Sequence, residues 1–310
     1  MSQKLYTDFS SFLSRYFTGK VQKISINAGF TCPNRDGTLG RGGCTYCNNR
    51  TFNPDYCGDR GSVTQQLEQG KAFFSRKYPT MKYLAYFQAY TNTYGEIDHL
   101  KSLYEEALAV EGVIGLVVGT RPDCMPESLL DYFTALSRET FVLIEYGVET
   151  SNDATLKRIN RGHSFACSVD AIQRTAKRGL PVGAHVILGL PGEKKEDILV
   201  SASKIAQLPL DTLKLHQLQL VRGTVMAREF EQCPSDFTLY TAEEYATLVV
   251  DYLERLNPAI AVERFTSQSP KELLIAPDWG LKNYEFVELV KRELIRRDTY
   301  QGRLFERSIY

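Results

Sequence analysis

Short apolar segments alternate with longer amphipathic segments along most of the chain. The apolar segments carry hydrophobic residues at consecutive positions, which is typical of strands buried on both faces of a parallel sheet. We expect six such strands, at residues 21–28, 83–88, 113–119, 141–148, 182–188 and 212–218. The amphipathic segments have the length of helices, and they lie at residues 63–76, 97–110, 127–136, 169–178, 195–206 and 242–256.

This repeat of strand and helix predicts an α/β fold with a parallel sheet and right-handed connections. The pattern by itself fits both an open doubly wound sheet and a partial barrel. After residue 257 the alternation of strand and helix ends. We expect a short strand at 260–265, a turn-rich stretch at 267–280 and a final helix at 284–297. We therefore expect three parts: an N-terminal helical segment at 1–18, a core at 19–256 and a small α+β extension at 257–310.

Composition and charge narrow the class of protein. The 310 residues are 43% hydrophobic and 24% charged, which is ordinary for a globular protein with a sizeable core. The formal net charge is zero, so any nucleic acid or membrane would have to bind a local patch. The N-terminus lacks the pattern of a secretory signal, and no apolar run reaches the roughly 18 residues of a membrane span. Seven cysteines are an odd number and do not resemble a disulfide framework, so we expect a cytoplasmic protein with reduced thiols.

Three of the cysteines, Cys32, Cys44 and Cys47, lie in one glycine-rich loop directly after the first predicted strand. In parallel barrels the active site gathers at this end of the strands. A structural zinc site needs four protein ligands, and the loop offers three. Three thiolates on a four-iron cluster would leave one iron open to an outside ligand. The alternative is a zinc site completed by Cys57 or His163.

The end of this loop, Cys44-Thr45-Tyr46-Cys47, resembles the Cys-x-aromatic-Cys part of the radical S-adenosylmethionine (radical SAM) signature. Eleven residues separate Cys32 from Cys44, more than in the commonest members, and this resembles the Elp3-like branch. The loop Cys-Pro-Asn-Arg-Asp-Gly-Thr is most similar to a bacterial radical SAM family that includes the YhcC and YtqA proteins. The resemblance extends over nearly the whole chain and implies a partial (β/α)6 TIM-type barrel.

The resemblance also implies positions that bind SAM. Gln88, after the second strand, takes the place that binds the methionine amino group, although the usual Gly-Gly-Glu is absent. Glu149 ends the fourth strand, where an acidic residue reaches the ribose, and Gly189 lies in the segment that packs beside adenine. Arg161 has a planar guanidinium that suits the SAM carboxylate. The alternative for Arg161 is a solvated charge beside a helix.

The chemistry that the resemblance implies requires one 4Fe-4S cluster and SAM. SAM chelates the open iron, and an electron from the cluster cleaves it to methionine and a 5′-deoxyadenosyl radical, which abstracts hydrogen from a substrate. A flavodoxin or ferredoxin would donate the electron. Because the Elp3-like branch acts on tRNA, a tRNA nucleoside is the first candidate substrate, and a small metabolite or a protein is the second. A zinc-stabilised RNA-binding module without turnover is the alternative from another class.

Three further residues are candidates for catalysis. Cys124 follows the third strand, in the same turn as Arg121 and Asp123, and His185 and His216 lie on predicted inner strands. A buried structural role is the alternative for each. We interpret Cys57 as a spare thiol, and Cys167 and Cys233 as buried or half-buried side chains.

Basic residues gather in two helical regions. Residues 157–178 hold six basic residues and one acidic residue, and the last helix adds Lys291, Arg292, Arg296 and Arg297. These regions would suit a phosphate backbone, and a solvated helix face is the alternative interpretation.

Overall fold

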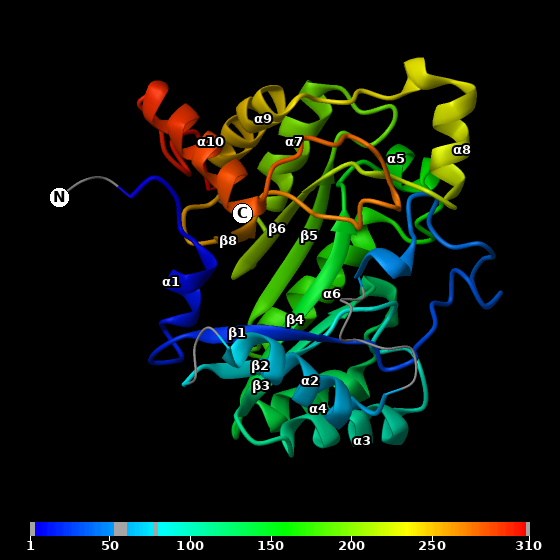
Figure 1. Cartoon of the computed structure of the whole chain (residues 1–310), viewed down its shortest axis with the longest axis vertical. Helices are drawn as coiled ribbons and strands as arrows, with labels where there is room; N and C mark the ends of the chain where they lie inside the picture. The colour runs from blue at the N-terminus through cyan, green and yellow to red at the C-terminus, as the bar shows by residue number, and fades with distance from the viewer. Residues whose placement is uncertain (1–3, 53–60, 77–79, 308–310) are drawn as a thin grey trace.

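In the computed structural model, which describes residues 4–52, 61–76 and 80–307, the parallel strands form one curled sheet. Figure 1 shows it as a half-barrel with helices on the outside. The spatial order is β1-β2-β3-β4-β5-β6-β8, so neighbours in the sheet follow the order of the chain. A doubly wound sheet would reverse this order part of the way, and the partial barrel is therefore confirmed. The strands span Val21–Ile26, Lys82–Phe87, Val113–Thr120, Phe141–Glu149, Val182–Leu188, Thr212–Gln217 and Ala261–Arg264.

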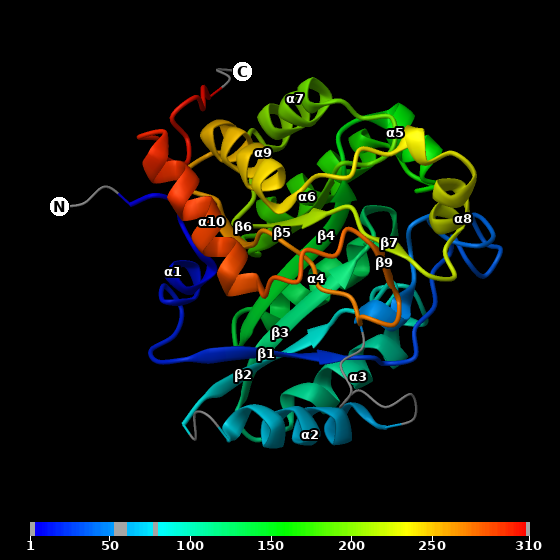
Figure 2. The ribbon, with the colours of Figure 1, turned by 45° about the horizontal axis from the view of Figure 1, so that its top comes forward.

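Helices cover the convex face of this sheet, as Figures 1 and 2 show from two directions. The helices that connect successive strands are α2 (Val63–Ser75), α3 (Ile97–Leu108), α4 (Glu127–Leu136), α6 (Phe165–Lys177), α7 (Lys195–Ile205) and α9 (Ala242–Arg255). The last helix, α10 (Asn283–Arg296), packs on α9. No helix of the described residues is both long enough and apolar enough to cross a membrane.

The structure differs from the sequence-based expectation in three places. The expected helix at 169–178 begins earlier, at Phe165, because the hydroxyl of Ser164 caps it by accepting a hydrogen bond from the amide of Cys167 (3.3 Å). Two short helices, α5 (Asp153–Arg158) and α8 (Val225–Gln232), were not expected. The short strand after residue 257 forms β8, which joins the main sheet beside β6 as a seventh strand. A separate antiparallel pair consists of β7 (Leu220–Val221) and β9 (Leu274–Ala276).

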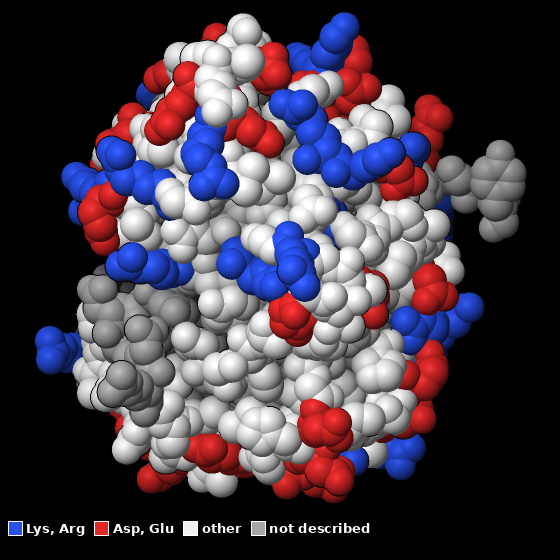
Figure 3. All heavy atoms as spheres, turned by 90° about the vertical axis from the view of Figure 1, so that its right-hand side faces the viewer, with Lys and Arg blue, Asp and Glu red and all other residues white. Residues whose placement is uncertain are grey.

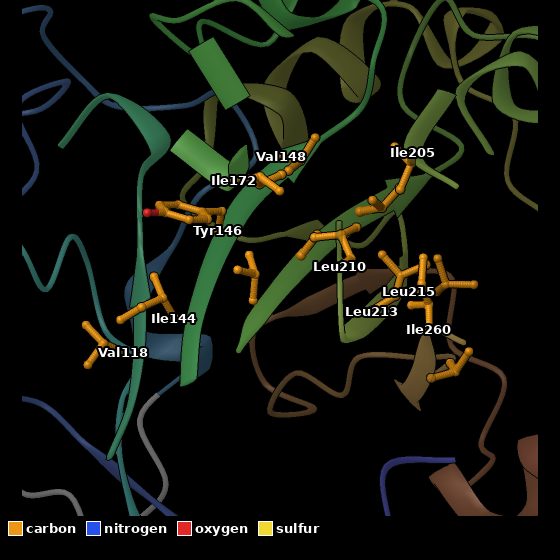
Figure 4. Packing of buried hydrophobic residues seen from close by; sticks show 14 of the residues in the cluster. Val118, Ile144, Tyr146, Val148, Ile172, Ile205, Leu210, Leu213, Leu215 and Ile260 are labelled. Carbon is orange, nitrogen blue, oxygen red and sulfur yellow. The ribbon is translucent and has the colours of Figure 1, made fainter. Parts of the chain in front are cut away.

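The outward side chains of the strands form the larger core. Figure 4 shows Val118, Ile144 and Tyr146 of neighbouring strands, with Ile172 of α6 near Tyr146 and Ile205 of α7 farther along the sheet near Leu210. These residues are buried. Because each strand is buried on both faces, the strand segments appear in the sequence as continuous apolar runs.

A smaller core closes the lower end of the barrel, where the strands begin. The short helix α1 (Phe9–Leu13) places Phe12 and Leu13 against Leu84, Phe141 and Leu143 of the inner sheet face. The Asp8 side chain caps this helix by accepting from the amide of Ser11 (2.7 Å). The barrel is therefore sealed at the lower end and open at the carboxyl ends of its strands.

We expect the Phe12→Ala variant to lose about 3–5 kcal/mol of unfolding free energy. Phe12 is fully buried, and its removal leaves a cavity between α1 and the sheet. Urea denaturation measures the loss. The Val200→Ala variant, at a position on α7 that is 54% exposed, is the control and should change stability by less than about 0.5 kcal/mol. Equal stability of both variants would contradict the role of α1 as a seal.

Candidate active site

A hollow opens at the carboxyl ends of the strands. It encloses about 860 Å³ of empty space, its open mouth included. Side chains from the cysteine loop and from the ends of β2 to β6 line it. Eight of the residues predicted from the sequence lie together here: Cys32, Cys44, Cys47, Gln88, Glu149, Arg161, His185 and His216. The strand ends therefore bring most of the predicted site into one place.

The cysteine loop folds tightly around the Arg35 side chain. The Arg35 guanidinium donates to the carbonyl of Cys47 (2.7 Å). Gly43 has φ of +78°, and a Cβ atom at this position would lie 2.7 Å from Nε of Arg35. Glycine is thus required at Gly43 both by conformation and by space.

The two unexpected helices anchor this loop from outside. The amide of Thr45 donates to the carbonyl of Ile159, directly after α5 (3.0 Å), and the amide of Met226 in α8 donates to the carbonyl of Thr45 (2.9 Å). The side chain of Asn160 also donates to the carbonyl of Gly43 (2.9 Å). Helices as short as these two give a weak sequence signal, yet they position the cysteines.

Nitrogen donors surround the three sulfur atoms. Asn34 Nδ2 lies 3.8 Å from the Sγ atom of Cys44, and Asn49 Nδ2 lies 3.7 Å from the Sγ atom of Cys47. Two guanidinium groups also approach the sulfurs: Arg161 Nη1 reaches Cys44 Sγ (3.6 Å), and Arg121 Nη1 reaches Cys32 Sγ (4.0 Å). Donors of this kind stabilise thiolates that ligate iron and tune the potential of the cluster.

The three loop thiols line one hollow, but they form no compact group with other ligating side chains among the described residues. Burial, with the neighbouring Cys44, raises the pKa of Cys47 to about 11, so its thiolate needs a compensating positive charge. Within the described residues, no group of three or more His, Cys, Asp and Glu side chains is close enough to hold a single metal ion. All three cysteines nevertheless line the same hollow, which fits a cluster that keeps its ligands apart.

An acid–base pair borders the hollow at the end of β4. Arg161 Nη2 lies 3.4 Å from Glu149 Oε1 and donates to the carbonyl of Gly147 (2.6 Å). Glu149 has φ of +67°, at an irregularity in the pairing of β4 with β5. The Nε atom of Arg161 is buried and has no hydrogen-bond partner among the described residues. A strained backbone and an unused donor at the rim of a cavity are features of ligand sites.

A buried ionic network forms the floor of the hollow, and the sequence analysis did not predict it. Glu145 Oε1 accepts from Lys23 (2.7 Å), and its Oε2 accepts from Lys214 (2.6 Å) and lies 2.9 Å from His185 Nε2. Glu263 binds the same two lysines at 2.6 and 3.3 Å. Lys23 belongs to β1 and Glu263 to β8, so this pair bridges the two edge strands of the half-barrel. Charged residues inside apolar strands were the signal that could have revealed the network.

The ammonium groups control the ionisation of Glu145. Burial alone would raise the pKa of this carboxyl, but Lys214 and Lys23 outweigh it and hold the pKa well below its usual range. Burial and the nearby Lys214 ammonium lower the pKa of His185. Burial and the Arg264 guanidinium lower the pKa of His216 well below its usual value. Both histidines are therefore neutral at pH 7, with ring centroids 5.6 Å apart.

Other candidates lie away from the hollow. Gly189 does not line it: a Cβ atom there would lie 3.2 Å from the Tyr240 ring. Cys124 is buried outside the hollow, where burial and Asp123 raise the pKa of its thiol to about 12, so the thiol is protonated at neutral pH. Both carboxylate oxygens of Asp123 accept hydrogen bonds from the Arg121 guanidinium (2.9 and 2.8 Å). Arg121 lines the hollow, whereas Asp123 does not.

Of the two ligands named for the zinc alternative, only His163 lies within the described residues. His163 does not line the hollow, and its Nδ1 atom lies 3.1 Å from the carbonyl of Ser164. Cys57 lies outside the described residues. Cys167 is partly buried and Cys233 is exposed.

Acidic side chains neutralise most of the positive charge in the two predicted basic regions. Arg174 and Arg178 of α6 both bind Glu127 of α4. On α10, Lys291 binds Glu288, and Arg296 and Arg297 both bind Glu293. Figure 3, which views the right-hand side of Figure 1, shows basic side chains across the middle and upper parts of that face and acidic ones both above and below its middle. Exposed arginines of the cysteine loop and its neighbour β7, Arg41, Arg50 and Arg222, form no ion pair within the described part of the chain.

A parallel half-barrel with a cysteine-lined hollow at its open end is the framework of an enzyme whose cofactor sits at the strand ends. The sequence pattern of the Radical SAM superfamily matches residues 30–205, and that of the Radical SAM C-terminal domain matches residues 210–296. The chain thus belongs to the radical SAM superfamily of enzymes.

Individual relatives agree with this. YtqA of Bacillus subtilis is 36% identical over 307 residues, which cover 99% of this chain and 94% of YtqA. YhcC of Escherichia coli is 38% identical over 278 residues, 89% of this chain and 88% of YhcC. A tRNA uridine(34) acetyltransferase of Dehalococcoides mccartyi is 26% identical over 61% of this chain and 40% of that protein.

The structure of archaeal Methanocaldococcus infernus Elp3 shares the fold. It has a TM-score of 0.66 at 17% identity, and the match covers 92% of this chain and 65% of that chain. Membership of the superfamily implies a 4Fe-4S cluster and SAM. The thiols with their nitrogen donors, the open hollow and the unused donor of Arg161 fit both.

Proposed function

We propose that Cys32, Cys44 and Cys47 bind one 4Fe-4S cluster, that SAM binds its open iron, and that the enzyme acts on a nucleoside of tRNA. When bound, the cluster would supply the electron that cleaves SAM into methionine and a 5′-deoxyadenosyl radical, which takes a hydrogen atom from the substrate. The observation that carries the proposal is the hollow in which three thiols, each approached by a nitrogen donor, lie beside an acid–base pair.

The residues around the hollow have distinct tasks in this proposal. Arg161 uses its free Nε–H for the SAM carboxylate, and its Nη1 stays at Cys44. Glu149 accepts hydrogen bonds from the ribose hydroxyls. Gln88 binds the methionine amino group through an amide oxygen that now accepts from Ser25 (3.1 Å). Gly189 allows close packing near the adenine side. We assign His185 and His216 to the substrate side of the hollow.

We expect the Gly147→Ala variant to bind SAM at least about tenfold more weakly, a loss of about 1.4 kcal/mol. A Cβ atom at Gly147 would lie 2.6 Å from Nη2 of Arg161 and 2.7 Å from Oε1 of Glu149, so it would push the pair apart. Equilibrium dialysis on the reconstituted enzyme measures this. In the control, Gly95→Ala, the new Cβ makes only ordinary contacts with Leu100, and SAM affinity should not change. Unchanged affinity of the Gly147 variant would contradict our assignment of Arg161 and Glu149.

Two observations support tRNA as the substrate: the relatives named above and the exposed arginines at the cysteine loop. A relative that carries the name tRNA uridine(34) acetyltransferase shares this part of the chain. Acids compensate most of the positive charge of α6 and α10, whereas Arg41, Arg50 and Arg222 at the cysteine loop form no ion pair within the described residues. These arginines suit phosphates on either side of a nucleoside that enters the hollow.

Anaerobic reconstitution tests the cofactor chemistry. The enzyme should bind iron and sulfide and form 5′-deoxyadenosine from SAM with dithionite. A colourless zinc protein without turnover would instead establish the non-catalytic alternative.

The substrate is tested separately, by mass spectrometry of tRNA nucleosides from a deletion strain. A changed profile supports tRNA, and an unchanged profile would overturn it in favour of a small metabolite or protein. Salt-sensitive binding of tRNA to a filter should accompany the change.

The same proposal places the enzyme in the cytoplasm, with flavodoxin or ferredoxin as the electron donor. An oxygen-sensitive cluster and free thiols suit a reducing compartment. To test the electron donor, purified flavodoxin or ferredoxin is added to the enzyme. The optical spectrum of the cluster then shows whether it is reduced.

A further inference from the structure

A bulge at the end of β8 turns two consecutive residues toward the inside of the barrel. The pairing of β6 with β8 shifts here: Leu213 pairs with Val262, and the next residue, Lys214, pairs with Arg264. The extra residue of a bulge breaks the usual alternation of faces. Glu263 therefore binds Lys214, while Arg264 Nη2 lies 3.1 Å from Nε2 of His216.

The Arg264 guanidinium is a positive charge inside the barrel that no acid of the described residues balances. Lys23 and Lys214 are balanced by Glu145 and Glu263. Arg264 forms no ion pair with any acid in the described ranges, and its Nε is buried there without a hydrogen-bond partner. A guanidinium offers five donors and no acceptor, so a single contact with an imidazole leaves most of them unused.

The partner of Arg264 cannot supply the missing charge. His216 is buried and neutral, and its ring nitrogens are 3.1 and 3.5 Å from the same guanidinium nitrogen. A partly buried cation with an uncharged neighbour costs free energy unless an anion completes the site. The arrangement is therefore incomplete without a negative group from outside the described chain.

The Arg264 guanidinium lies next to His216, a residue that borders two hollows. Arg264 itself does not line the main hollow, but His216 does, and His216 also lines a smaller hollow beside it. Tyr46 and Ile187 border both hollows, so the two are neighbours. Among the described residues, no acidic side chain lines the smaller hollow. An anion that enters there meets hydroxyl and amide groups of the described chain, such as those of Thr51, Gln217 and Ser267.

We propose that Arg264 and His216 bind an anionic group of the substrate, a carboxylate or a phosphate. The planar guanidinium matches both anions through paired hydrogen bonds. The SAM carboxylate has a separate partner in Arg161, beside Cys44. The inference rests on the proposed function, which places the substrate in this hollow, and it narrows the substrate to one with a negative charge near the reacting carbon.

Crystals of the reconstituted enzyme with SAM test the site directly. They are soaked separately in 4-bromobenzoate, as the carboxylate probe, and in selenate, as the phosphate-like probe. We expect an anomalous bromine or selenium peak with the anion oxygens in hydrogen-bond reach of Arg264, and its loss in Arg264→Gln. The probe that binds identifies the class of anion. No peak at Arg264 with either probe, or the same peak in Arg264→Gln, would overturn the proposal.

Turnover of tRNA from the deletion strain provides the second readout. Arg264→Gln should raise KM for this tRNA at least about 30-fold, as expected when one partner of a charge-assisted pair is removed. Arg264→Lys, which keeps the charge and loses the planar fork, should recover part of the affinity. The control is Arg138→Gln, at an exposed position near the start of β4, where KM should stay the same.

A fall in kcat with unchanged KM in Arg264→Gln would show a structural role and contradict the proposal. If the wild-type enzyme does not act on tRNA at all, the tRNA part of the proposed function fails. The soaked crystals still decide whether Arg264 binds an anion, so the two failures can be told apart.

Discussion

The Cys44→Ala variant should lose its cluster and its chemistry together. The Sγ atom of Cys44 has two nitrogen donors, from Asn34 and Arg161. Without this ligand the cluster has only two protein thiolates. We expect bound iron to fall to roughly a tenth of the wild-type content or less, and 5′-deoxyadenosine formation to fall below about 1% of the wild-type rate, because the cofactor carries the chemistry.

Iron analysis and 5′-deoxyadenosine assays under anaerobic conditions measure both effects. The Cys233→Ala variant is the matched control, since Cys233 is exposed at the end of α8 and outside the hollow, and it should keep both iron and activity. A Cys44→Ala enzyme with wild-type iron content would refute the three-cysteine assignment. An iron-free protein that retains bound zinc would point to the zinc alternative.

The Glu145→Ala variant should lose about as much stability as the core variant Phe12→Ala. It leaves Lys23 and Lys214 in a buried site with only Glu263 to balance them. Removing one partner of a buried ion pair costs about 3–5 kcal/mol, and we expect a loss of this size in urea denaturation. The paired change Glu145→Leu with Lys214→Met should recover most of the loss, because Lys23 and Glu263 still balance each other.

The effect of Glu145 should also depend on pH. The folded-state pKa of this carboxyl lies well below its usual value, so its stabilising effect is present above the ordinary carboxyl pKa of about 4.3 and is lost as the pH falls below it. The difference in stability between wild type and Glu145→Ala should therefore shrink in acid. In contrast, Lys291→Ala breaks a surface pair with Glu288 and should cost less than about 1 kcal/mol. A cost for Glu145→Ala no larger than this would contradict the network.

Much of the fold was accessible from the hydrophobic pattern. All six expected strands and the six helices between them are present, because a strand buried on both faces and an amphipathic helix each leave a regular local signal. The short helices α5 and α8 were missed. Their boundaries depend on single capping residues, Asn152 and Thr224, which resemble ordinary loop residues in a sequence.

The candidate site was predictable in part. The spacing of Cys32, Cys44 and Cys47, and their place after a strand, identified the superfamily before any geometry was considered. The bulge that turns Arg264 inward was not predictable, because strand register depends on pairing with a distant segment. For the same reason the contact of Arg174 with Glu127 of α4 could not be assigned from the sequence, whereas Glu288 lies only three residues before Lys291 on the same helix.

The sequence by itself determined where the strands and helices lie along the chain, since short-range patterns encode them, and its resemblance to a known family indicated the class of chemistry. Only the tertiary structure decided which charges meet. Lys23, Glu145 and Glu263 come from three strands that are far apart in the chain, and they share one buried network because the sheet curls until its edges approach. That closure creates the floor of the hollow and leaves Arg264 without an acid, and no local pattern in the chain contains this information.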